Sequence, residues 1–406
     1  MRVNPSQTIN ELITILAYVN DIDESRKLYH SHRVAILSAY IAKSLVSANK
    51  RREIFYGAVL HDIGGVGYPY HIIHYLRKNN KENRNILLSH PLIGAQLVST
   101  IPKLTPVAKL ILDHHEWANG QGYPRGKTLK FIPLGSQIIR IADSIDIAIQ
   151  TGRIHNLNNL KIALEKNIDK EYSKNLFNHS IKVLKQNGLL ADLLNKNALK
   201  ELFDSTQEKI GIIRVSNNID AIGTTMEVIA QVIDMKHPYT AGHSQRVSHY
   251  AMAIALAMNM SHDAITKIKW AGLIHDIGKL HVPRRILDKP NKLSKKEFRR
   301  IKEHAVLTEK LLNMVSSLKA IAPIASAHHE RFDGTGYPKG LKAEQIPLEA
   351  RILSVCDAFD AMTSNRPYKI TLSQEQACRE LEKYAGTQFD PEIIKQAIPL
   401  FKNLGL

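Results

Sequence analysis

Histidine and aspartate residues recur in this chain of 406 residues at a constant spacing of 214 positions. The later set comprises His275, Asp276, His304, His328, His329 and Asp357. The earlier set comprises His61, Asp62, His90, His114, His115 and Asp143. One offset shared by several separate segments indicates an internal duplication. We therefore expect two copies of one fold, each carrying the same group of metal-ligand side chains.

Helical periodicity dominates the sequence. Between His243 and Met258, apolar residues recur at the i, i+3, i+4 and i+7 spacing of an amphipathic helix. Ser294 and Glu297 form a capping box, which marks the start of another helix, and alternating runs typical of β-strands are scarce. The length suits two domains of about 200 residues each. We predict an all-α chain with domains at 1–190 and 222–406, joined by a helical connector at 191–221.

The chain carries a formal net charge of +17. Such a charge concentrates anionic partners, which include nucleotides, nucleic acid and acidic lipid. A solvated basic surface explains any single lysine equally well. The basic tract at residues 284–302 has no aromatic stacking pattern, so we expect no nucleic-acid partner.

Hydropathy and cysteine usage indicate the compartment. No apolar run approaches the ~18–20 residues that a membrane span needs, and the first residues lack the apolar core of a secretory signal. The two cysteines, Cys356 and Cys378, indicate no disulfide framework. We interpret Cys356, which adjoins Asp357, as a small buried residue and not as a nucleophile. These features predict a cytoplasmic protein with no membrane span.

The two repeated sets suit metal centres. A single histidine is most simply a hydrogen-bonded core residue, but burying several uncompensated imidazoles in one core would cost a few kcal/mol apiece. With His243, or with its counterpart His30, each copy offers five imidazoles and two carboxylates. That is too many for one ion but suits two ions that share a carboxylate. Asp276 is the expected bridge, because its side chain diverges from that of His275 by about 100° around a helix.

A centre with two metals can hold a hydroxide and bind the non-bridging oxygens of a phosphodiester, which supports in-line attack on phosphorus. Lys279 follows the ligand pair by one helical turn and would place a positive charge near the leaving oxygen. The alternative is a solvated cation that complements the helix dipole. Because Lys279 follows the ligands so closely, we predict that Lys279 and Asp276 are catalytic.

The second half resembles an HD-GYP domain, the cyclic-dinucleotide phosphodiesterase branch of the HD metal-dependent phosphohydrolases. The resemblance covers nearly all of residues 225–400. It is carried by the segments His243–Val247, His275–Lys279, Leu287–Leu293, His328–Pro338 and Asp357–Tyr368, together with His304. The resemblance implies an HD-type helical bundle with two iron or manganese ions, with zinc, nickel or magnesium left open. No glutamate precedes His243 to bind the third metal that some members hold.

The resemblance also implies the reaction, which is hydrolysis of cyclic di-GMP or of 3′,3′-cyclic GMP-AMP (3′,3′-cGAMP) to a linear dinucleotide or mononucleotides. The tandem arrangement is similar to that of some bacterial enzymes specific for 3′,3′-cGAMP, which favours that substrate. The Gly-Tyr-Pro segment would lie beside the substrate, with Gly334 and Gly336 allowing a tight turn of positive φ. The candidate substrate contacts are Lys289, Lys292, Arg331, Gly336, Tyr337, Pro338 and Arg366. Each basic residue in this set could instead be a surface charge that does not contact substrate.

The first copy keeps every ligand type but departs elsewhere. Its candidate second metal site comprises His30, His61, Asp62, His90, His114, His115 and Asp143. Gly65 stands where the second copy has Lys279, and the segments 74–79 and 150–155 replace the loops that carry candidate substrate contacts. We therefore predict a degenerate HD-GYP-like domain with a regulatory or scaffolding role.

Two other functions stay open. Both copies could form a cyclic-dinucleotide receptor with weak catalysis that signals to a partner, with a homodimer left open as the assembly. Alternatively, the chain could be an HD phosphohydrolase that acts on another nucleotide, such as a nucleoside triphosphate or an alarmone. The complete ligand set and Lys279 favour catalysis over sensing, and the Gly-Tyr-Pro segment disfavours the other nucleotides.

The divergence between the copies makes a direct prediction. His275→Ala should abolish hydrolysis of a cyclic dinucleotide, whereas His61→Ala should leave most of it, because only the second copy retains Lys279. Turnover by the two purified variants measures this. An equal loss of activity would contradict the assignment of catalysis to the second copy.

Overall fold

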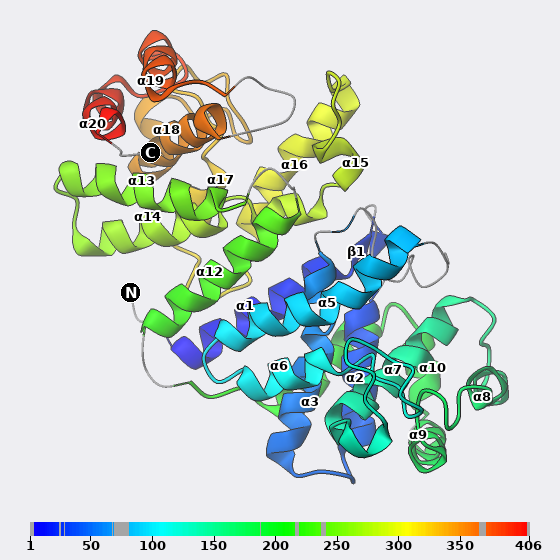
Figure 1. Ribbon diagram of the computed structural model, residues 1–406. Coiled ribbons are helices and arrows are strands. Elements are labelled where there is room, and N and C mark those ends of the chain that lie inside the picture. Colours follow the sequence, from blue (N-terminus) through cyan, green and yellow to red (C-terminus); the bar gives the residue numbers. More distant parts are fainter. Residues whose placement is uncertain are drawn as a thin grey trace. The chain divides into compact units, whose positions relative to one another are not determined.

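The computed structural model describes residues 4–23, 26–27, 29–66, 68, 81–186, 188–215, 219–236, 241–364 and 371–403. It separates into an N-terminal unit, Pro5–Thr224, and a C-terminal unit, which holds Thr225–Leu406 with Met1–Asn4. Helices build both units (Figure 1). Within the described ranges, the only paired strands are β1 (Ile22–Asp23) and β2 (Arg26–Lys27), which are two residues long and pair with each other in antiparallel orientation. The predicted all-α class is confirmed.

The N-terminal unit begins with α1 (Pro5–Asn20), and α2 and α3 pack closely on each other and on α7. Its further α-helices are α2 (His30–Ala42), α3 (Ala48–Leu60), α5 (Lys81–Thr100), α6 (Thr105–Leu112), α7 (Leu134–Gln150), α8 (Leu157–Glu165), α9 (Lys174–Gln186), α10 (Leu189–Leu194) and α11 (Leu199–Ile210). Two short 3₁₀ helices complete it, η1 (Ile63–Gly65) and η2 (Leu129–Phe131).

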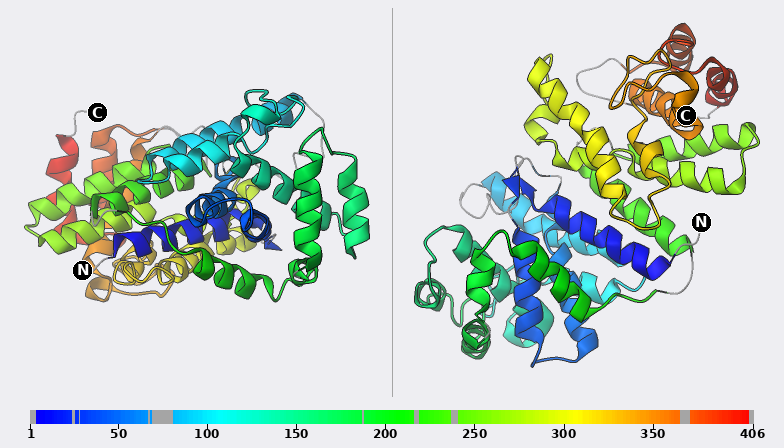
Figure 2. Two further views of the ribbon diagram at one scale, coloured as in Figure 1. Left: turned by 90° about the horizontal axis from the view of Figure 1, so that it is seen from below. Right: turned by 180° about the vertical axis from the view of Figure 1, so that it is seen from behind.

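The C-terminal unit repeats this order after α12 (Ile219–Met235), which crosses the division between the units. Helices α13 and α14 lie side by side in every view (Figures 1 and 2), as α2 and α3 do in the first unit. The α-helices are α13 (His243–Ala257), α14 (His262–Ile274), α15 (Arg284–Leu287), α16 (Lys295–Leu312), α17 (Ala322–Ser326), α18 (Leu348–Thr363), α19 (Gln374–Lys383) and α20 (Pro391–Lys402). The 3₁₀ helices are η3 (Ile277–His281) and η4 (Ala343–Gln345).

Local sequence signals set several of these boundaries. The Ser294 hydroxyl oxygen accepts a hydrogen bond from the Glu297 backbone N–H, and the Glu297 carboxylate accepts one from the Ser294 backbone N–H. The predicted capping box therefore starts α16. The Asp390 side chain likewise caps α20, with Pro391 at its first position.

The segment expected to be a connector, residues 191–221, lies mostly in α10 and α11. Phe203 of α11 is fully buried in the N-terminal unit, where its ring packs on Phe55 and on His32. Asn10 of α1 both donates to and accepts from the backbone of Ile213. The helical character is as expected, and the segment packs as part of the N-terminal unit.

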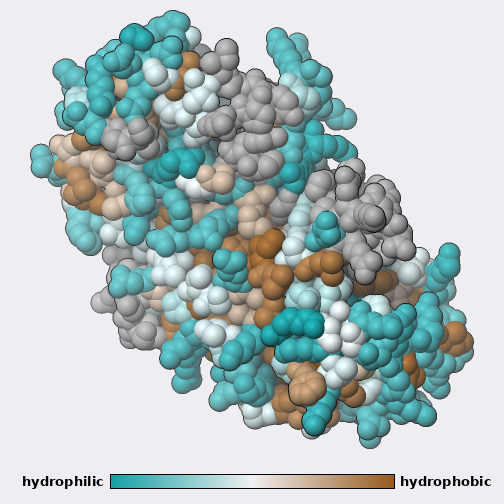
Figure 3. Space-filling model, in the orientation of Figure 1, coloured by the Kyte–Doolittle hydropathy of each residue, from teal (hydrophilic) through white to brown (hydrophobic). Residues whose placement is uncertain are grey.

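Hydrophilic residues cover much of the face drawn in Figure 3, and apolar residues gather in smaller patches between them. No helix in the part of the chain that the structure describes is long and apolar enough to cross a membrane. Three sequence predictions fall outside the described residues, namely Arg366, the replacement loop at 74–79, and most of the stretch just ahead of His243.

Aromatic packing should contribute to the stability of the C-terminal unit. Phe401 of α20 stacks on Phe359 of α18, with ring centroids 3.9 Å apart, and also contacts Tyr250 of α13. Phe401→Ala should therefore lower the free energy of unfolding by about 3–5 kcal/mol. Chemical denaturation of the full chain measures the loss. Leu256→Ala, at a 58% exposed position of α13, is the control, and an equal effect of both variants would contradict this packing.

Candidate metal centre

Different helix ends and faces bring the second set of ligands together in the C-terminal unit. His243 begins α13, His304 lies on α16 and Asp357 on α18, whereas His328 and His329 follow α17. His275 and Asp276 lie at the junction between α14 and η3. The sequence prediction placed this pair within one helix, which is wrong, because the chain changes from α-helix to 3₁₀ helix there.

Asp276 lies at the centre of the group. Its Oδ1 is 3.5 Å from His304 Nε2 and 3.7 Å from His328 Nε2. Its Oδ2 is 3.4 Å from His275 Nε2 and 3.9 Å from His243 Nε2. The two carboxylate oxygens therefore face two different groups of imidazoles. Such a division is what a carboxylate bridging two cations requires.

Backbone carbonyls fix the orientation of the imidazoles. The Nδ1 atoms of His275, His304 and His328 each bond the carbonyl oxygen three residues earlier, at 2.8, 2.5 and 2.7 Å. Since a carbonyl can only accept, each Nδ1 carries the proton and each Nε2 presents a lone pair. These three Nε2 atoms and Asp276 Oδ1 are buried with no hydrogen-bond partner among the described residues. Several buried acceptors without donors fit a bound cation.

His243 is oriented by a carboxylate instead. Its Nδ1 donates to Asp360 Oδ2 at 2.7 Å, and its Nε2 lies 3.3 Å from Asp357 Oδ1. Arg246 donates to the same Asp360 carboxylate. Sequence reasoning missed Asp360, although Asp146 precedes it by the same 214 positions and binds His30 Nδ1 at 2.6 Å. The duplication offset could have identified both carboxylates.

Electrostatics favour the protonation states that a metal needs at His304, His329 and Asp276, and His243 is the exception. Burial lowers the pKa of His304 to about 4 and, together with the charge of His304, that of His329 to about 3. Burial would raise the pKa of Asp276, but Lys279 and the adjacent imidazoles hold it well below its usual value. Burial likewise opposes ionisation of His243, yet Asp357 and Asp360 raise its pKa to about 9. The ring nearest two carboxylates is thus the one most readily protonated.

Gly278 permits the ligands to approach one another. A Cβ at this position would lie 2.0 Å from the His304 carbonyl oxygen, so only glycine allows η3 to pack on α16. The Gly278 N–H donates to Thr308 Oγ1, whose hydroxyl donates to the His275 carbonyl. Gly64 meets the His90 carbonyl in the same way in the first unit, at 2.2 Å.

Lys279 extends from η3 to the centre. Its Nζ donates to Asp276 Oδ2, and its side chain is 27% exposed, whereas that of Asp276 is 3% exposed. The ammonium group therefore lies between the buried carboxylate and solvent.

The Gly-Tyr-Pro loop packs over one edge of the ligand group. Glu330 accepts from the backbone N–H groups of Lys339 and Leu341, which holds the loop closed. Tyr337 lies against the His329 ring, with centroids 4.8 Å apart, and joins Pro338 through a cis peptide bond. Gly334 has the expected positive φ of 84°.

Gly336 departs from the prediction, because the described backbone does not give it a positive φ. A Cβ there would lie 2.3 Å from the Arg331 backbone nitrogen, so close approach explains this glycine.

The predicted substrate contacts have varied surroundings. Lys289 Nζ pairs with both carboxylate oxygens of Glu297, at 2.8 and 2.7 Å. Arg331 bonds Asp333, Thr335 and Gln388, which anchors the Gly-Tyr-Pro loop. Lys292 is exposed. The described contacts thus give Arg331 and Lys289 structural partners.

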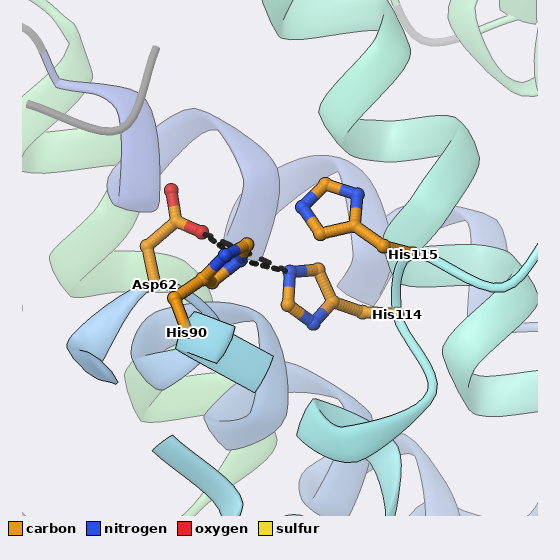
Figure 4. A group of neighbouring side chains, drawn as sticks. All are labelled: Asp62, His90, His114 and His115. Atoms are coloured by element: carbon orange, nitrogen blue, oxygen red, sulfur yellow. Dashed lines mark hydrogen bonds and ion pairs between the residues drawn. The ribbon is translucent and has the colours of Figure 1, made fainter. Parts of the chain in front are cut away.

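The N-terminal unit assembles the first set in the same pattern. Asp62 Oδ1 faces His90 and His114, at 3.3 and 3.8 Å, and Oδ2 faces His30 and His61, at 3.3 and 3.5 Å. Figure 4 shows Asp62, His90 and His114 converging, with His115 beside them. His30 Nε2 also lies 3.7 Å from Asp143 Oδ1.

One residue distinguishes the first cluster. Arg140 Nη1 lies 2.7 Å from His115 Nδ1 and 3.0 Å from Asp143 Oδ2. Because a guanidinium only donates, His115 Nδ1 accepts, and the neutral ring carries its proton on Nε2. A protonated Nε2 has no lone pair for a metal, so His115 does not fit ligation as the other histidines do. The counterpart of Arg140 at the 214 offset is Ser354, so the C-terminal centre has no such constraint at this position.

The chain matches the HD domain family twice, over residues 19–171 and 227–393. It is 30% identical over 350 residues to the 3′3′-cGAMP-specific phosphodiesterase 3 of Vibrio cholerae, covering 82% of this chain and 71% of that protein. It is 27% identical over 364 residues to the 3′3′-cGAMP-specific phosphodiesterase 1 of the same organism, covering 85% and 80%.

Shorter and structural similarities accompany these. The cyclic di-GMP phosphodiesterase of Thermotoga maritima is 38% identical over 187 residues, which are 46% of this chain and 51% of that protein, so the chain spans about half of that relative. The crystal structure of the V. cholerae cyclic GMP-AMP specific phosphodiesterase V-cGAP3 superposes with a TM-score of 0.65 at 24% identity, covering 98% of both chains. This likeness shows a shared fold.

The partner of His243 should tune metal affinity. Asp360→Asn keeps the shape of the side chain but removes the charge opposite His243 Nδ1, so metal affinity should fall about 10–100-fold. Elemental analysis after dialysis against graded chelator measures this. Asp263→Asn, in an ion pair on the α14 surface, should retain metal as the wild type does. Equal retention by Asp360→Asn would contradict the role of Asp360.

Proposed function

This chain belongs to the HD-domain family, in its HD-GYP group of cyclic-dinucleotide phosphodiesterases, and we propose that the C-terminal unit carries its catalytic centre. The chain is an enzyme that hydrolyses a cyclic dinucleotide with the help of divalent metals. The assignment of the centre rests on one observation. The two carboxylate oxygens of Asp276 face separate groups of imidazole lone pairs.

The C-terminal residues fit two cations. One position is lined by Asp276, His304, His328 and His329, and the other by Asp276, His243 and His275, with Asp357 adjacent to His243. Bound there, such a pair would supply Lewis-acid activation of water and of the phosphodiester oxygens. Mixed imidazole and carboxylate ligands fit iron, manganese or zinc, and the family resemblance favours iron or manganese among these.

The chain's own residues orient and neutralise the reacting groups. Asp276 is held ionised by its surroundings, and the His243 ring is held in place by Asp360. Lys279 places its ammonium at the solvent edge of Asp276, where it can stabilise negative charge on the leaving oxygen of the phosphodiester. Tyr337 covers His329 and closes one side of the centre to solvent.

The substrate is proposed to be 3′,3′-cGAMP, with cyclic di-GMP as the alternative. The two relatives that cover most of both chains are named for 3′3′-cGAMP. The higher identity to the cyclic di-GMP phosphodiesterase extends over less than half of this chain. The similarity to these two 3′3′-cGAMP enzymes therefore extends over both units of this chain. We give this long alignment more weight than the higher identity over one part of the chain, so 3′,3′-cGAMP is the favoured substrate.

The N-terminal unit is proposed to regulate or to scaffold the C-terminal one. Gly65 replaces the lysine beside the ligand pair, and Arg140 engages two of the potential ligands. Metal should therefore bind there with fewer ligands, at His30, His61, Asp62, His90 and His114. A homodimer and the absence of a nucleic-acid partner stay predictions.

Removal of the lysine tests the proposed chemistry. Lys279→Ala should lower kcat for cyclic-dinucleotide hydrolysis about a hundredfold or more, because charge stabilisation at the leaving group is lost. Lys319→Ala, at an exposed position away from the centre, should leave kcat unchanged. The assay uses metal-loaded protein with 3′,3′-cGAMP, cyclic di-GMP and a nucleoside triphosphate in parallel.

The panel also separates the alternatives. We expect the fastest turnover with 3′,3′-cGAMP, and faster turnover of cyclic di-GMP would reverse the substrate assignment. Preferred hydrolysis of the triphosphate, or full activity of Lys279→Ala, would overturn the proposed site.

A further inference from the structure

The N-terminal unit contains a cavity of about 320 Å³ beside its ligand cluster. Helices α7 and α8, the turn after α8 and the segment at residues 115–123 line it, with His115 at the side of the cluster. This volume lies at the lower end of the range for small-molecule pockets. Apolar walls come from Ile147 and Leu164, together with the indole of Trp117.

Three residues of this lining have buried polar atoms without a hydrogen-bond partner among the described residues: Trp117 Nε1, Tyr123 Oη and Arg140 Nε. The indole and guanidinium nitrogens only donate, and the phenol can donate. Arg140 is only 7% exposed. Buried polar groups in folded proteins are normally paired. Three unpaired donors on residues that line one cavity are consistent with a ligand rich in hydrogen-bond acceptors.

The charges around the cavity suit an anion. Arg140 and Lys166 line it together with one carboxylate, that of Glu171, and Asp143 outside the lining also pairs with Arg140. Glu171 is already paired with Arg140 Nη2 at 3.1 Å. Lys170 adds a cation 5.1 Å from the centroid of the Trp117 ring. The Nε–H of Arg140 is left for a further acceptor.

The cavity is not a copy of the catalytic centre. At the duplication offset, Trp117 corresponds to Arg331 and Arg140 to Ser354, so two of the three donors differ in the second unit, whereas Tyr123 corresponds to Tyr337. Arg140 also ties the cavity to the ligand cluster through His115. A ligand that bonds Arg140 would thus contact the residue that distinguishes the two clusters.

We propose that this cavity binds a nucleoside monophosphate. A nucleobase is flat enough to pack against Trp117 and the aliphatic walls, and its carbonyl and ring nitrogens or its phosphate supply acceptors for the three donors. The small volume favours one nucleotide over a cyclic dinucleotide. The choice of a nucleotide rests on the proposed function, because hydrolysis of a cyclic dinucleotide can end in such products.

Trp117 reports on this site directly, because Trp270 is the only other tryptophan. In full-length, metal-loaded Trp270→Phe protein, GMP or AMP should change the Trp117 fluorescence saturably. Asp276→Ala in that background should preserve this signal while it abolishes hydrolysis. This separates failure of the cavity proposal from failure of the proposed catalytic function. Inorganic phosphate and 3′,3′-cGAMP serve as parallel probes.

Two further variants test the location of binding. Ala163→Phe fills the cavity from α8 and should abolish GMP or AMP binding, whereas Ile162→Phe, at a 61% exposed position of the same helix, should not. Arg140→Ser, which copies the C-terminal residue, should weaken binding about tenfold to a hundredfold through loss of a charge-assisted hydrogen bond.

Equilibrium dialysis of the wild-type chain with labelled GMP or AMP gives the same comparison without the Trp270→Phe change. No saturable binding at millimolar nucleotide would overturn the proposal. Binding that Ala163→Phe leaves intact would also overturn it, as would a response to phosphate alone or stronger binding of 3′,3′-cGAMP.

Discussion

A buried aspartate surrounded by imidazole lone pairs is the interaction on which each unit depends. Asp276 in one unit and Asp62 in the other lie where several histidines converge, with their Nε2 atoms 3.3 to 3.9 Å from the carboxylate oxygens. Without a cation, buried acceptors at this separation would carry a desolvation cost with no compensating bond. The helical scaffold thus holds side chains whose burial a bound cation would compensate.

The duplication shows which features belong to the scaffold and which to the chemistry. Both units keep the shared aspartate, the glycine that follows it and the carboxylate behind the first histidine. They differ at Lys279, which is Gly65 in the first unit, and at Arg140, which is Ser354 in the second. One exchange removes a cation beside the shared carboxylate, and the other adds one beside a ligand histidine. The first unit therefore retains the architecture but lacks the lysine cation that we propose for catalysis in the second.

The sequence was sufficient to predict the fold class, the duplication and the convergence of the ligands. Helix caps and helical periodicity are local patterns, and the repeated spacing is visible directly in the order of the residues. It did not predict the 3₁₀ geometry at Asp276 or the close packing at Gly336, since both arise from contacts with distant backbone. Asp360 was within reach of the duplication offset. The position of Arg140 against His115 depends on how α7 packs on the segment that follows α6, and no local sequence pattern encodes this packing.

We propose that Asp276 would serve as a ligand to two divalent cations in the C-terminal unit. Anomalous diffraction from crystals of the metal-loaded chain, collected on both sides of the iron or manganese absorption edge, tests it most directly. We expect two anomalous peaks in that unit, one beside each carboxylate oxygen of Asp276. A single peak, or peaks that do not contact Asp276, would contradict it.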